Sequence, residues 1–184
     1  MIIKLRDMTD DQKQQMVETS AFQKEQIELS DIIWEDGLEI VKQKANELNT
    51  NGFEIDFEPE NADLGFSSQG WYFSRYPGAP YLSFTIDLPN GTFFTGEINS
   101  YWNGDLEDLG SYTWTNEEGE DVEAENEDEI KSYLDKVKSV YTAFINLIGE
   151  NENGADYDNV IDYLIGRGAS WDDEKEEFVW NDEE

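Results

Sequence analysis

Cysteine and histidine are both absent from this chain of 184 residues. Without cysteine, neither a disulfide framework nor a thiolate metal site can form, and without histidine the usual zinc, copper and iron sites lose their main ligand. Catalysis would then need a pair of carboxylates, a serine with a lysine base or a metal held by acids. In a chain with 44 Asp and Glu, some carboxylates must lie close together, so a pair of carboxylates does not indicate an active site. We therefore expect a protein that is not an enzyme and that uses no cofactor.

Long hydrophobic runs are also missing. The residues from Met1 to Asp7 are too short an apolar stretch, and too soon charged, for a signal peptide. No apolar run approaches the roughly 20 residues that a helix needs to cross a bilayer. These observations predict a cytoplasmic protein.

Basic residues are scarce, because 12 Lys and Arg stand against 44 Asp and Glu and leave a formal net charge of -32. Double-stranded DNA carries one negative charge per ~1.7 Å of axis, so this charge equals that of roughly 16 base pairs. A compact chain of this length has a radius of gyration near ~16 Å, so its charge density approaches that of nucleic acid. The aromatic content of 14% is typical of a folded core and not of a disordered acidic segment. Such a protein repels nucleic acid and anionic membranes, and its expected partners carry basic surfaces.

The acids gather in two zones, one of which lies between Arg75 and Lys131, where no basic residue occurs. Runs of like charge are commonly solvated faces, and that interpretation stays open for each run. The sequence contains no EF-hand calcium loop. Such a loop needs an Asp at its first position, a Gly at its sixth and a Glu at its twelfth, and no Gly of the acidic zones has both acids at these positions. The candidate partner-binding residues are Asp105, Glu107, Asp108, Glu117, Glu118, Glu120, Asp121 and Glu123 in the first zone, and Asp172, Asp173 and Glu174 in the terminal zone.

Hydrophobic periodicity predicts an α+β fold in a single acidic domain over residues 1–184. A helix is expected from Thr9, where Gln12 completes a capping box. A second helix is expected from Ser30 or Asp31 to the turn at 49–52, so that the two form an N-terminal helical hairpin.

Alternating apolar residues between Phe53 and Ile98 predict the short strands of an antiparallel meander, with helices packed on one face. A broad apolar stripe predicts a long helix near residues 127–149. A shorter helix over 156–165 and a terminal hairpin ending at Trp180 should follow. Residues 150–184 are either an integral part of the domain or an appendage of helix and hairpin.

Residues 62–74 read Ala-Asp-Leu-Gly-Phe-Ser-Ser-Gln-Gly-Trp-Tyr-Phe-Ser. This segment resembles a strand-turn-strand stretch, Phe-Ser-x-Phe-x-Ser-Gln-Gly, that follows two helices in small uncharacterised phage proteins. The opening from Met8 to Lys13 is similar to the start of that family's first helix. The resemblance covers about residues 7–75, although Trp71 and Tyr72 replace the family's Asp-Gly pair. It implies a phage origin and no particular mechanism.

Charge and size together resemble those of phage DNA-mimic anti-defence proteins, the anti-CRISPR and anti-restriction inhibitors. These proteins share no motif through which residues could be transferred. The resemblance implies an inhibitor in an infected bacterial host cell, where carboxylates stand in for phosphates in the groove of a nuclease. Two other functions stay open. One is an acidic binding module, such as an antitoxin or a chaperone for a basic protein, and the other is a carbohydrate-binding or hydrolytic domain that uses aromatic residues near Trp71 and Trp102.

A test of the first acidic zone follows from the even spread of its charge. Single neutral substitutions between Asp105 and Glu123 should cost little, whereas four or more together should weaken binding to a basic nuclease and flatten its salt dependence. The measurement is inhibition at several salt concentrations. A multiple variant that inhibits as well as the parent at every concentration would remove this zone from the interface.

Overall fold

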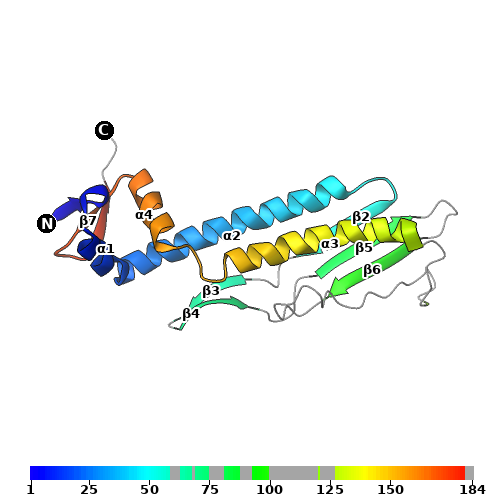
Figure 1. The fold of residues 1–184 in the computed structure, drawn as a ribbon, viewed down its shortest axis with the longest axis horizontal. Coiled ribbons are helices and arrows are strands. Elements are labelled where there is room, and N and C mark those ends of the chain that lie inside the picture. Colours follow the sequence, from blue (N-terminus) through cyan, green and yellow to red (C-terminus); the bar gives the residue numbers. More distant parts are fainter. Residues whose placement is uncertain are drawn as a thin grey trace. The chain divides into compact units, whose positions relative to one another are not determined.

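The computed structural model describes residues 1–58, 63–67, 69–74, 81–87, 93–99, 120 and 127–180. The described residues form helices and antiparallel strands, so the α+β class is confirmed. Figure 1 shows these elements coloured along the sequence, and the chain divides into two compact units. The first unit contains Met1–Glu35, Phe66–Trp71 and Asn153–Glu184, and the second contains Asp36–Gly65 and Tyr72–Glu152.

The N-terminal region contains the short 3-10 helix η1 (Leu5–Asp7) and the helix α1 (Asp10–Val17). The predicted capping box is confirmed, because Gln12 N donates to Thr9 Oγ1 at 3.3 Å and Thr9 N donates to Gln12 Oε1 at 2.9 Å. These two bonds satisfy backbone groups that the first turn of a helix leaves without partners.

The second helix, α2 (Ser20–Leu48), begins ten residues before the expected start, so the prediction of a break at Ser30 is wrong. Its first turn is capped by Thr19, whose Oγ1 accepts from Phe22 N at 3.3 Å. Ser30 caps nothing, because its Oγ donates to Gln26 O, one turn back in the same helix, at 2.7 Å. The expected hairpin of two helices meeting near residue 30 is therefore not formed.

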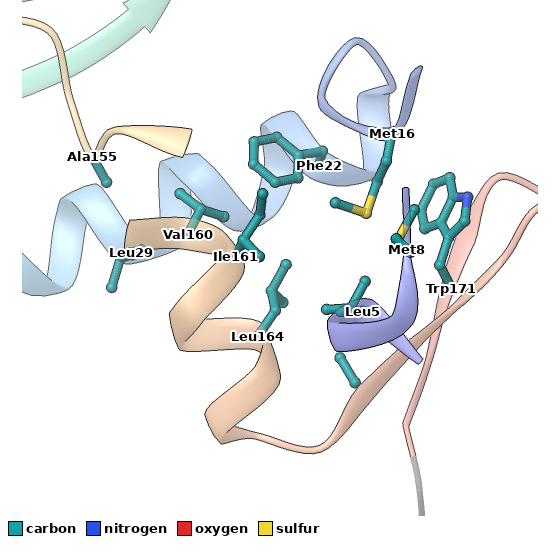
Figure 2. Close-up of a cluster of buried hydrophobic side chains, with 11 residues drawn as sticks. Leu5, Met8, Met16, Phe22, Leu29, Ala155, Val160, Ile161, Leu164 and Trp171 are labelled. Atoms are coloured by element: carbon teal, nitrogen blue, oxygen red, sulfur yellow. The ribbon is translucent and has the colours of Figure 1, made fainter. Parts of the chain in front are cut away.

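Residues from both ends of the chain build the core of the first unit. Strand β1 (Ile2–Lys4) pairs with β7 (Ala169–Asp172), which also pairs with β8 (Glu177–Trp180), so the predicted terminal hairpin is confirmed and has a third strand. Helix α4 (Tyr157–Gly166) begins at the N-cap Asp156, whose side chain accepts from Asn159 N. Figure 2 shows the buried cluster, which comprises Leu5, Met8, Met16, Phe22, Leu29, Ala155, Val160, Ile161, Leu164, Ala169 and Trp171.

The second unit combines a sheet of β2 (Phe53–Glu58), β5 (Tyr81–Asp87) and β6 (Phe93–Asn99) with the helix α3 (Glu127–Glu150), which confirms the predicted long helix. Phe53, Ile55 and Phe57 of β2 are buried, while the alternate residues Glu54 and Asp56 are exposed. Phe57 lies against Phe144 of α3, with ring centroids 5.1 Å apart. Figure 1 shows α3 along one face of this sheet.

The order of the strands differs from a simple meander. β2 pairs with β5, with Ile55 opposite Phe84, and the intervening strands β3 (Asp63–Ser67) and β4 (Gly70–Ser74) pair with each other. Period-2 patterns predict the strands, but they do not determine which strands become neighbours. No helix within the described ranges contains an apolar stretch long enough to span a bilayer.

The first unit should depend strongly on Leu164, which is fully buried in its core. Leu164→Ala should lower the free energy of unfolding by about 2–5 kcal/mol, because it removes buried methyl groups and leaves a cavity. Ile32→Ala is the control, since Ile32 is exposed, and its effect should stay within about 0.5 kcal/mol. Urea unfolding followed by circular dichroism measures both, and equal losses would contradict this description of the core.

Candidate acidic interface

The first predicted zone falls mainly outside the described residues. Of its candidates only Glu120 is described, and it is exposed. Asp105, Glu107, Asp108, Glu117, Glu118, Asp121 and Glu123 lie outside the described ranges. The assignment of this zone to an interface therefore stays a prediction.

The terminal zone is described in full, and two of its three acids are paired. Asp172 is 8% exposed, and its Oδ1 lies 3.3 Å from the Met1 ammonium and accepts from Glu174 N at 3.2 Å. Glu174 Oε1 lies 3.4 Å from the same ammonium. Lys175 Nζ is 3.9 Å from Asp172 Oδ2 and 3.3 Å from Glu177 Oε1. Asp172 therefore holds β1 and the hairpin turn together, and only the exposed Asp173 keeps its carboxylate outside the ion pairs of the described chain.

The pKa of Asp172 reflects these contacts. Burial alone would raise the pKa, but the hydrogen bond from Glu174 N–H, the Met1 ammonium and Lys175 outweigh it, so the pKa lies below its ordinary value. The pKa of the Met1 ammonium is raised, because its hydrogen bonds and charge interactions with Asp172 and Glu174 outweigh the opposing effect of desolvation. Both shifts favour the charged pair in the folded state.

A second acidic surface lies on α2, and the sequence-based prediction missed it. Glu28, Asp31 and Glu35 are exposed and follow one another at spacings of three and four residues, so they share one face of the helix. The expected start of a new helix at residue 30 concealed this row, because it separated Glu28 from the other two acids. The continuous helix holds the row over roughly 10 Å of its axis. We call Glu28, Asp31 and Glu35 the acidic row.

The charges within the acidic row are not equivalent. Glu28 Oε1 lies 3.6 Å from Arg167 Nη1, whereas no basic group of the described chain lies within 4.0 Å of the Asp31 or Glu35 carboxylate. Partial desolvation, followed by the negative charge of Glu35, raises the pKa of Asp31. Like charges four residues apart on a helix destabilise it by about 0.2–0.5 kcal/mol. Asp31 and Glu35 are therefore uncompensated charges on a rigid element.

The neighbouring Glu25 is buried and differs from the acidic row. Its Oε2 has no hydrogen-bond partner among the described residues and lies 3.9 Å from Arg167 Nη1. Desolvation and the nearby Glu28 raise the pKa of Glu25, while Arg167 and Lys24 oppose the rise. Arg167 is itself held between rings, because its guanidinium carbon lies 4.6 Å from the centroid of Trp180 and 5.3 Å from that of Tyr163. Arg167 is thus an internal partner of acids and aromatic rings.

The described part of the chain contains no group of three or more acidic side chains that could hold a metal ion. Comparison with protein-family models, with curated proteins and with solved structures finds no match to this chain. The resemblance of residues 7–75 to phage proteins therefore stays a prediction.

The pairing of Asp172 predicts a specific pH dependence. An acid whose pKa is lowered by folding stabilises the folded state above its unfolded pKa, and this contribution disappears as pH falls through its folded pKa. Asp172→Asn should therefore be less stable than the parent at pH 7, and the difference should shrink below about pH 4. Urea unfolding across a pH series measures it. Asp173→Asn is the matched control and should stay near the parent, whereas a pH-independent loss in Asp172→Asn would contradict this account.

Proposed function

We propose that this protein is a phage-type anti-defence inhibitor that acts as a DNA mimic. In this proposal it occupies the nucleic-acid-binding groove of a host nuclease, a CRISPR effector or a restriction enzyme, in the cytoplasm of an infected bacterial cell. The observation that carries the proposal is the pair Asp31 and Glu35, which lie on one continuous helix without a basic partner among the described residues, in a chain whose formal net charge is -32.

Rigidity matters because binding by a disordered acidic segment would lose conformational entropy. Asp31 and Glu35 lie within the 29 residues of α2, so the backbone between them is ordered before a partner arrives. Carboxylates held in this way meet the Lys and Arg side chains of a groove without the cost of ordering their own backbone. This supports a role as a substitute for a phosphate backbone.

The distribution of cations supports the same function. Arg167 is already engaged by Glu25, Glu28 and two aromatic rings, and Lys175 is engaged by Asp172 and Glu177. Both cations therefore neutralise the acids beside them, and neither lies within ion-pair distance of Asp31 or Glu35. The field outside the protein stays negative, so it accelerates encounter with basic proteins and repels nucleic acid.

Inhibition by this route involves no chemical step. The protein and DNA would exclude one another from one basic groove, so inhibition would be stoichiometric, competitive with DNA and weaker at high salt. An antitoxin or a chaperone for a basic protein would share the salt dependence. Competition with DNA for a nuclease separates the proposed function from that alternative.

The experiment measures displacement of a fluorescent DNA duplex from purified CRISPR effectors and restriction enzymes. Asp31→Asn combined with Glu35→Gln should weaken displacement by about threefold to tenfold at low salt, because exposed ion pairs contribute about 0.2–1 kcal/mol each. The salt dependence should also become shallower. The proposal of a DNA mimic is wrong if the parent protein releases DNA from none of these nucleases even in dilute buffer.

The matched control is Asp158→Asn combined with Asp162→Asn. These two acids are also exposed and four residues apart on a helix, so the control changes net charge by the same amount. The control should displace DNA nearly as well as the parent. Equal weakening by the two double variants would assign the effect to net charge and exclude a specific role for Asp31 and Glu35.

A further inference from the structure

A cleft of about 420 Å³ lies in the first unit, which is within the range of roughly 300–1,000 Å³ typical of ligand sites. Three aromatic residues line it, namely Phe66, Trp71 and Tyr157, together with Asp156 and residues with amide side chains, which include Gln26. We call this site the aromatic cleft. Phe66 and Tyr157 are exposed large apolar residues, with 36% and 55% of their surface accessible, so their rings are open to a ligand.

The wall of the aromatic cleft is held in place by the segment before α4. Gln26 Nε2 donates to Ala155 O at 2.6 Å, and Ala155 N donates to Ser30 Oγ at 2.7 Å. All these groups are buried, so both backbone groups of Ala155 are tied to side chains of α2. Figure 2 shows Ala155 at the margin of the core beside α2. This wall of the cleft is therefore fixed by the fold of the unit.

The rings are positioned by close contacts. Gly154 has a φ of 68°, and a side chain at this position would overlap the Trp71 indole, so the indole lies directly over the backbone of Gly154. Phe66 packs edge-to-face on Trp71 with centroids 5.2 Å apart, and Tyr157 packs edge-to-face on Phe22 at 5.7 Å. Each ring thus has a support that leaves part of its surface free.

The charge of the aromatic cleft favours a cation. Among the described residues no Lys or Arg lines it, whereas Asp156 does. The Asp156 oxygens accept from Asn159 N at 2.8 Å and Asn159 Nδ2 at 3.0 Å, which leaves acceptor capacity on the carboxylate. Asp156 and Asp158 also offset the positive end of the α4 dipole. With a formal net charge of -32, the protein repels anionic ligands such as nucleotides from this site.

The same unit shows how aromatic rings and acids hold a cation. The Arg167 guanidinium lies over Trp180 and Tyr163, its Nη1 donates to Tyr163 OH at 3.1 Å, and it faces Glu25 and Glu28. The aromatic cleft is lined by corresponding residues, three aromatic ones and Asp156, and by no Lys or Arg of the described chain. A planar guanidinium fits such a site better than an ammonium, because it stacks on rings and donates two parallel hydrogen bonds to a carboxylate.

We propose that the aromatic cleft receives the guanidinium group of an arginine side chain from the basic partner. The inference rests on the proposed function for the source of the arginine, while the site itself rests on the geometry of the first unit. An arginine in this cleft would add a specific anchor to an interface that is otherwise dominated by long-range charge.

The first test uses a small probe and no nuclease. N-acetyl-arginine N-methylamide is titrated into the full chain, and binding is followed by NMR through the Trp71 indole N–H, which is assigned with Trp71→Phe. The citrulline analogue has nearly the same shape and no charge. We expect the arginine probe to bind at least about tenfold more tightly, because the rings and the carboxylate both favour a cation. Equal binding of the two probes, or no binding of either, would overturn the proposal.

Two variants and one matched control distinguish a loss of arginine binding from a loss of stability of the fold. Asp156→Asn keeps an N-cap residue of similar strength, so the helix is retained while the charge is lost. It should weaken arginine binding by at least about fivefold, whereas Asp158→Asn, with the same charge change in the same helical turn, should stay within about twofold. Tyr157→Ala should weaken arginine binding and lower thermal stability only slightly, because Tyr157 is 55% exposed and loses a single edge-to-face contact with Phe22. Equal effects of Asp156→Asn and Asp158→Asn would overturn the assignment.

The second test concerns the source of the arginine. Once a nuclease is found from which the parent protein displaces DNA, Asp156→Asn and Tyr157→Ala should displace it less well than Asp158→Asn. Unchanged displacement by both cleft variants would overturn the assignment to the partner's arginine. Failure of the parent protein itself to displace DNA would instead contradict the DNA-mimic function, and the probe titration would still decide whether the cleft binds a guanidinium.

Discussion

The first unit depends on two buried hydrogen bonds to the backbone of Ala155. Its carbonyl accepts from Gln26 and its N–H donates to Ser30, so a segment close to the C-terminus is tied by both of its polar groups to one turn of α2. Leaving either buried group without a partner would cost about 1–3 kcal/mol. The same attachment places Gly154 under Trp71 and Asp156 at the start of α4, so the core and the aromatic cleft share one support.

Arg167 and Lys136 both contact aromatic rings in the structure. Arg167 lies on Trp180 and Tyr163 and faces two glutamates. In the second unit, Lys136 Nζ lies 5.2 Å from the ring centroids of Phe53 and Tyr133. These cations stabilise local packing and neutralise few exposed acids. A chain with a formal net charge of -32 can therefore fold around aromatic cores while it keeps a strongly negative exterior.

The two proposed binding features have different physical roles. The uncompensated acids Asp31 and Glu35 act through long-range electrostatics, which increases the rate of encounter and is screened by salt. The aromatic cleft acts only on contact, through stacking and a short-range ion pair, and would distinguish one basic partner from another. Asp172 was predicted to contact a partner because it lies in an acidic run. It has neither role, because it is buried against the chain's own ammonium group.

Local signals in the sequence were sufficient for the α+β class, the capping box at Thr9, the long helix α3, and helix α4 with the hairpin that follows it. Each depends on residues within one or two turns, or on a period that a short window contains. The tertiary structure decided the rest. Ser30 could begin a helix or lie inside one, and its burial against Ala155 settles the choice. The pairing of β2 with β5, the burial of Asp172 and the aromatic cleft all require segments far apart in sequence to meet, which depends on packing and not on any local pattern of residues.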